Sequence, residues 1–266
     1  LILIKIMGGN VVIHFHGKGI RKYTRKSNFW LFLYKTILKK VHIIHLSPVL
    51  FKDVENIRDK KCKLFAVPNG IKFKEMKSNL SKNKVFTFIY LSNLVPDKGA
   101  DLLIKASSLI PEFLQHKFQV FLVGEESDAN FKKDIDRLIS QNKYGNIKLL
   151  KPSYGDEKFR LLLSSMVFVL PTKNDCFPLS IIEAMASGLA VISTDEGAIA
   201  EIIDDGKTGK IIKKLEPQIL AKSMKKYIDD MELASSHGKK GQERYQKYFT
   251  NQNFEINLID CLNKLV

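Results

Sequence analysis

Short apolar runs alternate with longer stretches of helical periodicity along most of the chain. The runs are rich in Val, Ile and Phe and are four to eight residues long, which is typical of buried β-strands. They cover residues 11–15, 41–46, 63–67, 85–92, 118–124, 147–150, 167–171, 190–194 and 209–213. Helices are expected over residues 28–40, 101–109 and 130–140, and over most of 215–266. Strands that alternate with helices predict parallel sheets covered by helices, and therefore an α/β fold.

A polar, lysine-rich segment interrupts this alternation at residues 73–84, which we interpret as a linker. It would separate an N-terminal part, residues 1–72, from a C-terminal domain with a helical tail, residues 85–266. A first part of about 70 residues is short for a doubly wound domain of two mononucleotide-binding halves. We therefore expect the N-terminal domain to be incomplete and the chain to begin part-way through a longer protein.

The charge balance is basic, with 43 Lys and Arg against 28 Asp and Glu, and a net charge of +15. Such a balance suits anionic partners, such as nucleotides, nucleic acid or an acidic membrane surface, but a dispersed solvated charge explains it equally well. No apolar run reaches the roughly 18 residues of a membrane span. The three cysteines are widely scattered, which favours reduced thiols and a cytoplasmic location.

Four predicted strands end in polar or glycine-bearing loops. Their sequences are LSNLVPDKG, VGEES, LPTKNDCF and STDEGA. Ligands of parallel α/β sheets bind outside the carboxyl ends of the strands. Four such loops on one edge therefore predict a binding site there more strongly than any single loop does.

The stretch NDCFPLSIIEAMASGLAVIST places Asp175 in a loop and Glu183 in the following predicted helix. Ser180 and Glu183 fit a capping box, in which Ser180 caps the helix, and Gly188 would end it. The N–H groups at the start of such a helix form an anion site suited to a diphosphate. Each acid alone could be structural, Glu183 as a capping partner and Asp175 as a turn residue. Acids on both sides of one anion site favour binding of sugar hydroxyls.

Other candidates are less specific. Lys98, at the start of another predicted helix, would either pair with phosphate or be a solvated charge. Gly197 would either let the backbone approach a ligand closely or have only a structural role at the start of a helix. His14 and His16 lie on the same side of the first strand, but no third metal ligand is evident near them. His16, at the strand end, is the better site candidate, although a structural role is the more common one for such a histidine.

Taken together, these motifs resemble the retaining glycosyltransferases of family 4, which have a GT-B fold of two facing Rossmann-like domains. The family motif, E-x7-E followed by AMA-x-G-x-P-V, reads D-CFPLSII-E-AMASGLAV here. Further matches are VPNGI, LSNLVPDKGADLLIKA and STDEGAIAEIIDDGKTG. The resemblance implies transfer of a hexosyl group, with retention, from a nucleotide sugar to a glycan or lipid-linked acceptor in bacterial surface polysaccharide synthesis. It favours UDP over GDP and requires no metal or other cofactor.

The resemblance also implies roles for particular residues. Glu183 would hold the ribose hydroxyls of the nucleotide, Asp175 would face hydroxyls of the donor sugar, and Lys98 would neutralise the diphosphate. The residues implied to be catalytic are His16, Lys98 and Asp175. The residues implied to bind the nucleotide are Asn93, Gly124, Leu179, Ser180 and Glu183.

The sequence departs from the family pattern at several of these positions. Asp175 replaces the usual Glu and is one methylene shorter. Asn93 stands where many members carry a second phosphate-binding Arg, which leaves more of the anion binding to Lys98. Ala190 replaces a common Pro, and Glu126 replaces the second Gly of a typical VGxG turn. The last two departures concern details of the donor rather than the fold.

Basic and aromatic residues mix in the segment 18–40. Helical spacing places Trp30, Leu33, Tyr34 and Ile37 on one stripe. One prediction is that this stripe contacts the anionic inner face of the cytoplasmic membrane. The alternative is a core helix with a solvated basic flank. No nucleic-acid-binding motif is present, so no nucleic-acid partner is expected. The alternatives to a transferase are a non-catalytic fragment, a basic membrane-surface binding protein, and a GT-B nucleotide-sugar epimerase. The E-x7-E-like motif favours the transferase.

Overall fold

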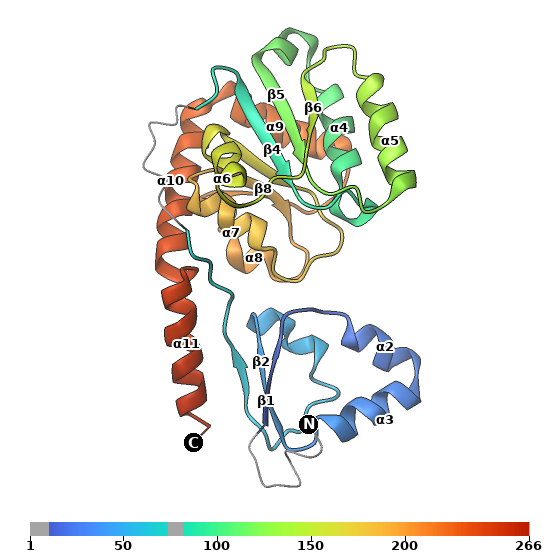
Figure 1. Ribbon diagram of the computed structural model, residues 1–266, viewed down its shortest axis with the longest axis vertical. Coiled ribbons are helices and arrows are strands. Elements are labelled where there is room, and N and C mark those ends of the chain that lie inside the picture. Colours follow the sequence, from blue (N-terminus) through green and yellow to red (C-terminus); the bar gives the residue numbers. More distant parts are fainter. Residues whose placement is uncertain (1–10, 74–81, 266) are drawn as a thin grey trace.

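The computed structural model describes residues 11–73 and 82–265, whose strands form two parallel sheets (Figure 1). The smaller sheet contains β1 (Val11–Phe15), β2 (Val41–His45) and β3 (Leu64–Ala66). The larger sheet contains β4 (Phe86–Leu91), β5 (Phe118–Val123), β6 (Ile147–Leu150), β7 (Val167–Leu170), β8 (Ala190–Thr194) and β9 (Gly209–Ile212). The predicted strands agree with these bounds to within one or two residues, and the predicted α/β class is confirmed.

The larger sheet has the strand order β6-β5-β4-β7-β8-β9. Its central strands β4, β7 and β8 are buried at nearly every position, as expected for parallel strands covered by helices on both faces. The helices that connect the strands of this sheet or directly follow it are α4 (Ala100–Ser108), α5 (Ala129–Ser140), α6 (Gly155–Ser164), α7 (Leu179–Ala186), α8 (Ile199–Ile202) and α9 (Pro217–Asp229). β4 is the first strand of the sheet along the chain. β5 and β6 are added on one side of it, and β7, β8 and β9 on the other.

The smaller sheet has its own core beneath α2 (Ile20–Lys26) and α3 (Asn28–Ile37). The predicted helix over residues 28–40 ends early, at Ile37, and the turn that follows contains Lys40 in a left-handed conformation, φ 56°, with its N–H donating to Asp59. Tyr34 and Ile37, together with Leu31, pack on this core. Of the two alternatives for the predicted stripe, the core helix is therefore the correct one for Tyr34 and Ile37, and membrane contact is excluded for these two residues. The exposed aromatic residues of the two helices are Tyr23, Phe29, Trp30 and Phe32.

The C-terminal helices α10 (Met231–Tyr248) and α11 (Asn251–Asn263) run along one side of the molecule, from the larger sheet to the smaller one (Figure 1). Cys261 of α11 is buried with Ile44 and Val67 of the N-terminal part. The backbone of Ile71 bonds to the segment between the two helices, accepting from Asn251 N–H and donating to the Phe249 carbonyl. The helical tail thus holds the two sheets together.

Most of the predicted linker, residues 74–81, lies outside the described part of the chain. Among the residues that the structure describes, no helix has the combination of length and apolar character needed to cross a membrane.

Two glycines of α10 provide a matched test of its packing. A Cβ at Gly238 would lie 2.1 Å from the carbonyl oxygen of Gly188, whereas a Cβ at Gly241 would have its nearest neighbours at an ordinary 3.6 Å. Gly238→Ala should therefore lower the free energy of unfolding by about 1–3 kcal/mol through overpacking. Gly241→Ala should be neutral or raise it by up to about 1 kcal/mol through helix propensity. Urea denaturation of both variants measures the difference, and equal changes would contradict the packing described.

Candidate nucleotide-sugar site

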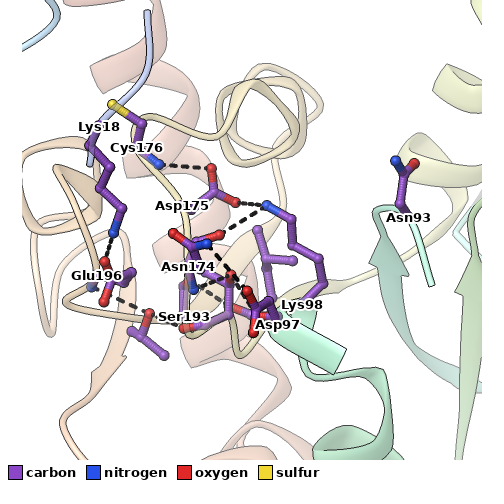
Figure 2. A network of polar contacts seen from close by, with 12 residues as sticks. Lys18, Asn93, Asp97, Lys98, Asn174, Asp175, Cys176, Ser193 and Glu196 are labelled. Carbon is purple, nitrogen blue, oxygen red and sulfur yellow. Dashed lines mark hydrogen bonds and ion pairs between the residues drawn. The ribbon is translucent and has the colours of Figure 1, made fainter. Parts of the chain in front are cut away.

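The order of the larger sheet reverses between β4 and β7, so the loops that leave these two strands diverge at their carboxyl ends. Such a switch point is where open α/β sheets bind ligands. Lys98, in the loop after β4, places its Nζ 2.5 Å from Asp175 Oδ2 and 3.2 Å from the Asn174 carbonyl oxygen, both in the loop after β7 (Figure 2). The structure thus brings two of the predicted site residues into direct contact across the switch point.

The loop after β7 is held by hydrogen bonds on both sides. The Asp97 carbonyl accepts from Lys173 N–H at 2.7 Å and from the Thr172 hydroxyl at 3.1 Å. The Asp97 carboxylate accepts from the Asn174 side chain at 3.2 Å. On the other side, the Thr194 hydroxyl of β8 donates to the Thr172 carbonyl at 2.9 Å. These bonds fix the backbone that carries Asp175.

Two glycines in these loops are required by backbone packing. Gly197 has φ +60°, and a Cβ there would lie 2.3 Å from the Asp175 carbonyl oxygen. A Cβ at Gly124 would lie 1.9 Å from the Ser92 carbonyl oxygen. Each glycine therefore lets one strand-end loop approach its neighbour, which accounts for both residues without a ligand.

The predicted capping box is wrong. Helix α7 begins at Leu179 after Pro178, which serves as the N-cap without a side-chain hydrogen bond, so Ser180 already lies inside the first turn. Glu183 does not reach back to the helix start but pairs with Lys158 of α6, with Oε1 and Nζ 2.5 Å apart. The first N–H groups of an α-helix have no acceptor within the helix. Those of Leu179 and Ser180 can therefore face an anion, as the resemblance implies.

Lys158 was missed because only four strand-end loops were considered at the sequence level. A fifth loop, KPSYGDEK, follows β6 and leads into the first turn of α6. Since β6 is parallel to the other strands, its end lies on the same edge of the sheet. That placement was the available signal for Lys158.

Asn93 and Gly124 line a small hollow of about 70 Å³ together with Tyr154, at the ends of β4, β5 and β6. The Tyr154 hydroxyl donates to the Glu125 carboxylate. Figure 2 shows Asn93 set apart from the Lys98–Asp175 pair. The predicted residues of the larger sheet therefore fall into separate places: Lys98 with Asp175, Glu183 with Lys158, and Asn93 with Gly124.

His16 lies exposed just after β1, with its ring centroid 4.2 Å from that of His14. No hydrogen bond or ion pair joins His16 to Lys98 or Asp175 in the part of the chain that the structure describes. A contact between the N-terminal part and the larger domain is made two residues later, where Lys18 forms an ion pair with Glu196 (Figure 2). Partial burial lowers the pKa of Lys18, while the nearby Cys176 thiol and Asp175 carboxylate oppose that shift.

Lys18 and Glu196 were also missed by the sequence analysis. Lys18 shares the strand-end loop of His16, and Glu196 precedes Gly197, so both were close to residues already considered.

Over the ranges 11–73 and 82–265, no group of three or more His, Cys, Asp or Glu side chains is arranged to hold a metal ion.

Residues 71–244 match the family model of the glycosyl transferases group 1. The chain belongs to this family. An uncharacterized glycosyltransferase of Methanocaldococcus jannaschii is 29% identical over 160 residues, which are 60% of this chain and 43% of that protein. The capsular polysaccharide biosynthesis glycosyltransferase CapM of Staphylococcus aureus is 27% identical over 198 residues, 71% of this chain and 51% of CapM. The chain thus spans about half the length of these two curated relatives.

The fold of this group 1 chain is similar to that of the Anabaena protein HepE, solved in complex with UDP. The TM-score is 0.84 at 18% identity, and the match covers 99% of this chain and 74% of HepE. Likenesses of this kind confirm the predicted GT-B type of fold, with parallel sheets and a helical C-terminal region.

The histidine pair generates a prediction on pH. Burial, followed by the neighbouring His16, lowers the pKa of His14 from 6.5 to about 4 in the folded protein. Between these values the unfolded chain binds the additional proton, so acid favours unfolding. We therefore expect the free energy of unfolding to fall as the pH is lowered from about 6.5 to about 4. Urea denaturation across this range measures it.

In that series, His14→Gln should make the pH dependence shallower, whereas Asn130→Gln, a change without a titratable group at an exposed position on α5, should leave it unchanged. A slope that is the same in the wild type and in His14→Gln would show that His14 is not the responsible group.

Proposed function

We propose that this chain binds a nucleotide sugar, preferably a UDP-sugar, at the β4–β7 switch point and supports transfer of its sugar with retention. The acceptor would be a glycan or lipid-linked molecule in surface polysaccharide synthesis, in keeping with the similarity to CapM. The observation that carries the proposal is the Lys98–Asp175 pair beside the first turn of α7. It places a cation, a carboxylate and helix N–H groups at the edge where such sheets bind ligands.

The chemistry follows from charge. Cleavage of the bond between the sugar and the diphosphate places negative charge on the leaving oxygen. Lys98 and the N–H groups of Leu179 and Ser180 would stabilise that charge. As Lys98 turns to the diphosphate, Asp175 would lose an ion-pair partner and accept hydrogen bonds from the sugar hydroxyls instead. No residue is assigned as a nucleophile.

The nucleoside would lie on the side of β5 and β6. Glu183 Oε1 is paired with Lys158, so its Oε2 is the atom that we assign to the ribose hydroxyls. The hollow at Asn93, Gly124 and Tyr154 lies further along the same sheet edge and offers room for part of the nucleoside. The preference for UDP over GDP is supported by the UDP bound in the HepE structure.

Replacement of Glu183 tests the donor site. Glu183→Gln should weaken UDP binding about tenfold or more, because a charge-assisted hydrogen bond contributes roughly 1.5–3 kcal/mol. Isothermal titration calorimetry with UDP and GDP measures the change, and circular dichroism verifies folding. Glu232→Gln, on the exposed start of α10, is the matched control. Equal UDP affinities for the two variants would contradict the assignment.

A second proposal concerns the exposed aromatic face of α2 and α3. Tyr23, Phe29 and Phe32 are 60%, 66% and 70% exposed, beside basic residues such as Arg25 and Lys26. Exposed aromatic and basic side chains together suit the surface of an anionic membrane, where rings insert at the headgroup level and cations meet anionic lipids. We propose that this face contacts such a membrane during transfer to a lipid-linked acceptor.

Vesicle sedimentation tests this contact. The chain should bind vesicles that contain phosphatidylglycerol and not vesicles of phosphatidylcholine alone, and added salt should weaken the binding. Changing Phe29 and Phe32 together to Ser should reduce binding severalfold. Phe113→Ser removes an aromatic side chain that is equally exposed, at 66%, in the larger domain, and should have no effect. Equal binding to neutral and acidic vesicles would rule out the proposal.

A further inference from the structure

A cavity of about 400 Å³ lies between the N-terminal part and the carboxyl edge of the larger sheet. Its N-terminal wall includes Lys18, Arg21, Lys22 and Lys52, and its other wall includes Asn174. Four cationic side chains therefore meet at one hollow, and none of the roles assigned above uses Arg21, Lys22 or Lys52.

The acids that line the same cavity are already engaged. Glu196 is paired with Lys18. The Asp53 carboxylate accepts hydrogen bonds of 3.0–3.1 Å from three backbone N–H groups around the start of α2. Within residues 11–73 and 82–265, Arg21, Lys22 and Lys52 form no ion pair with an acidic side chain. The cavity thus presents three cations whose charge is not neutralised by a paired acid.

The basic surface continues beyond this cavity. A second hollow of about 240 Å³ shares Arg21 and Lys52 with the first and adds Lys60. Its acid, Glu55, is paired with Arg58. Because the two hollows share Arg21 and Lys52, the basic surface extends beyond the cavity that Asn174 lines.

The cavity adjoins the candidate donor site. Asn174 is the residue before Asp175, and the backbone of Gly197, which also lines the cavity, packs on the Asp175 carbonyl. A molecule in the cavity would therefore lie beside the carboxylate that is proposed to face the donor sugar. That is the position an acceptor needs, since transfer requires its hydroxyl close to the reacting carbon.

We propose that this cavity is an acceptor subsite that binds a phosphate ester, with Arg21, Lys22 and Lys52 on the phosphate oxygens. The inference rests on the proposed function and adds the chemical class of the acceptor. A phosphate monoester carries about −1.5 to −2 charges at neutral pH and three acceptor oxygens. An Arg fork and nearby Lys side chains match such a group better than they match a neutral glycan. The phosphate belongs either to a soluble sugar phosphate or to a lipid-linked diphosphate.

Calorimetry with two probes distinguishes these sources. Glucose 1-phosphate represents the soluble acceptor and farnesyl diphosphate in detergent represents the lipid-linked one, with glucose as the uncharged control. UDP is added first at saturating concentration, so that the donor's own diphosphate site is filled. The wild-type chain should bind at least one phosphate-bearing probe and should not bind glucose.

Arg21→Gln and Lys52→Gln should each weaken probe binding about tenfold, which is what loss of one charge-assisted hydrogen bond produces. UDP affinity should not change in either variant. Lys133→Gln, at an exposed position on α5, is the matched control and should leave both affinities unchanged. Circular dichroism of both variants verifies that α2 and the smaller sheet remain folded.

The proposal is overturned if neither probe binds the wild type, or if both variants bind the probes as tightly as Lys133→Gln does. Probe binding that depends on Arg21 and Lys52 in a chain that fails to bind UDP would support the phosphate subsite and count against the donor site. The failures of the two proposals are thereby separable.

Discussion

The parallel pairing of β4 with β7 is the constraint on which the candidate site depends. Because the strand order reverses there, the loops after these strands leave the same edge and turn apart. The room between them would collapse if the loops were free to move. Hydrogen bonds that Asp97 accepts and a bond that Thr194 donates hold the loop after β7 from both sides, and Gly197 allows the loop after β8 to pack directly on it. The position of Asp175 is therefore set by backbone contacts before any ligand arrives.

Each candidate acid of the site is matched by a cation from a different loop or helix. Lys98 pairs with Asp175, Lys158 with Glu183, and Lys18 with Glu196. A partly buried carboxylate needs such a partner, since an unpaired charge in that environment is strongly unfavourable. A nucleotide sugar would have to exchange some of these contacts for its own, so part of its binding free energy offsets the lost ion pairs. The pairs stabilise the carboxylates of the site and also favour ligands that can replace both charges.

Local sequence patterns were sufficient to predict the strands of both sheets and the end of α7. Gly188 was predicted to end that helix, and it adopts the left-handed conformation, φ +74°, that this role requires. Apolar runs identify buried parallel strands because burial on both faces leaves no polar positions. The start of α7 was mispredicted because Pro178 competes with Ser180 for the same role and lies earlier in the chain. The pairing of Lys158 with Glu183 and of Lys18 with Glu196 could not be assigned from local patterns. Ion pairs between distant segments depend on how strands and loops align in space, which short-range periodicity does not encode.

The two sheets contribute differently to the proposed binding sites. The larger sheet carries the residues proposed to bind the nucleotide sugar, and it contributes most of an extensive core that Leu46 and Leu50 of the N-terminal part also join. The cavity proposed for the acceptor needs both sheets, because its cations come from the N-terminal part and Asn174 comes from the C-terminal part. Its width is set by contacts between the two parts, including Lys18–Glu196 and the bond of 2.5 Å from the Ser47 hydroxyl to Glu201. Correct orientation of two reactants can contribute roughly 7–11 kcal/mol to lowering a barrier. Changes at these contacts should therefore affect sugar transfer more than nucleotide binding, since only transfer requires both walls to be in place.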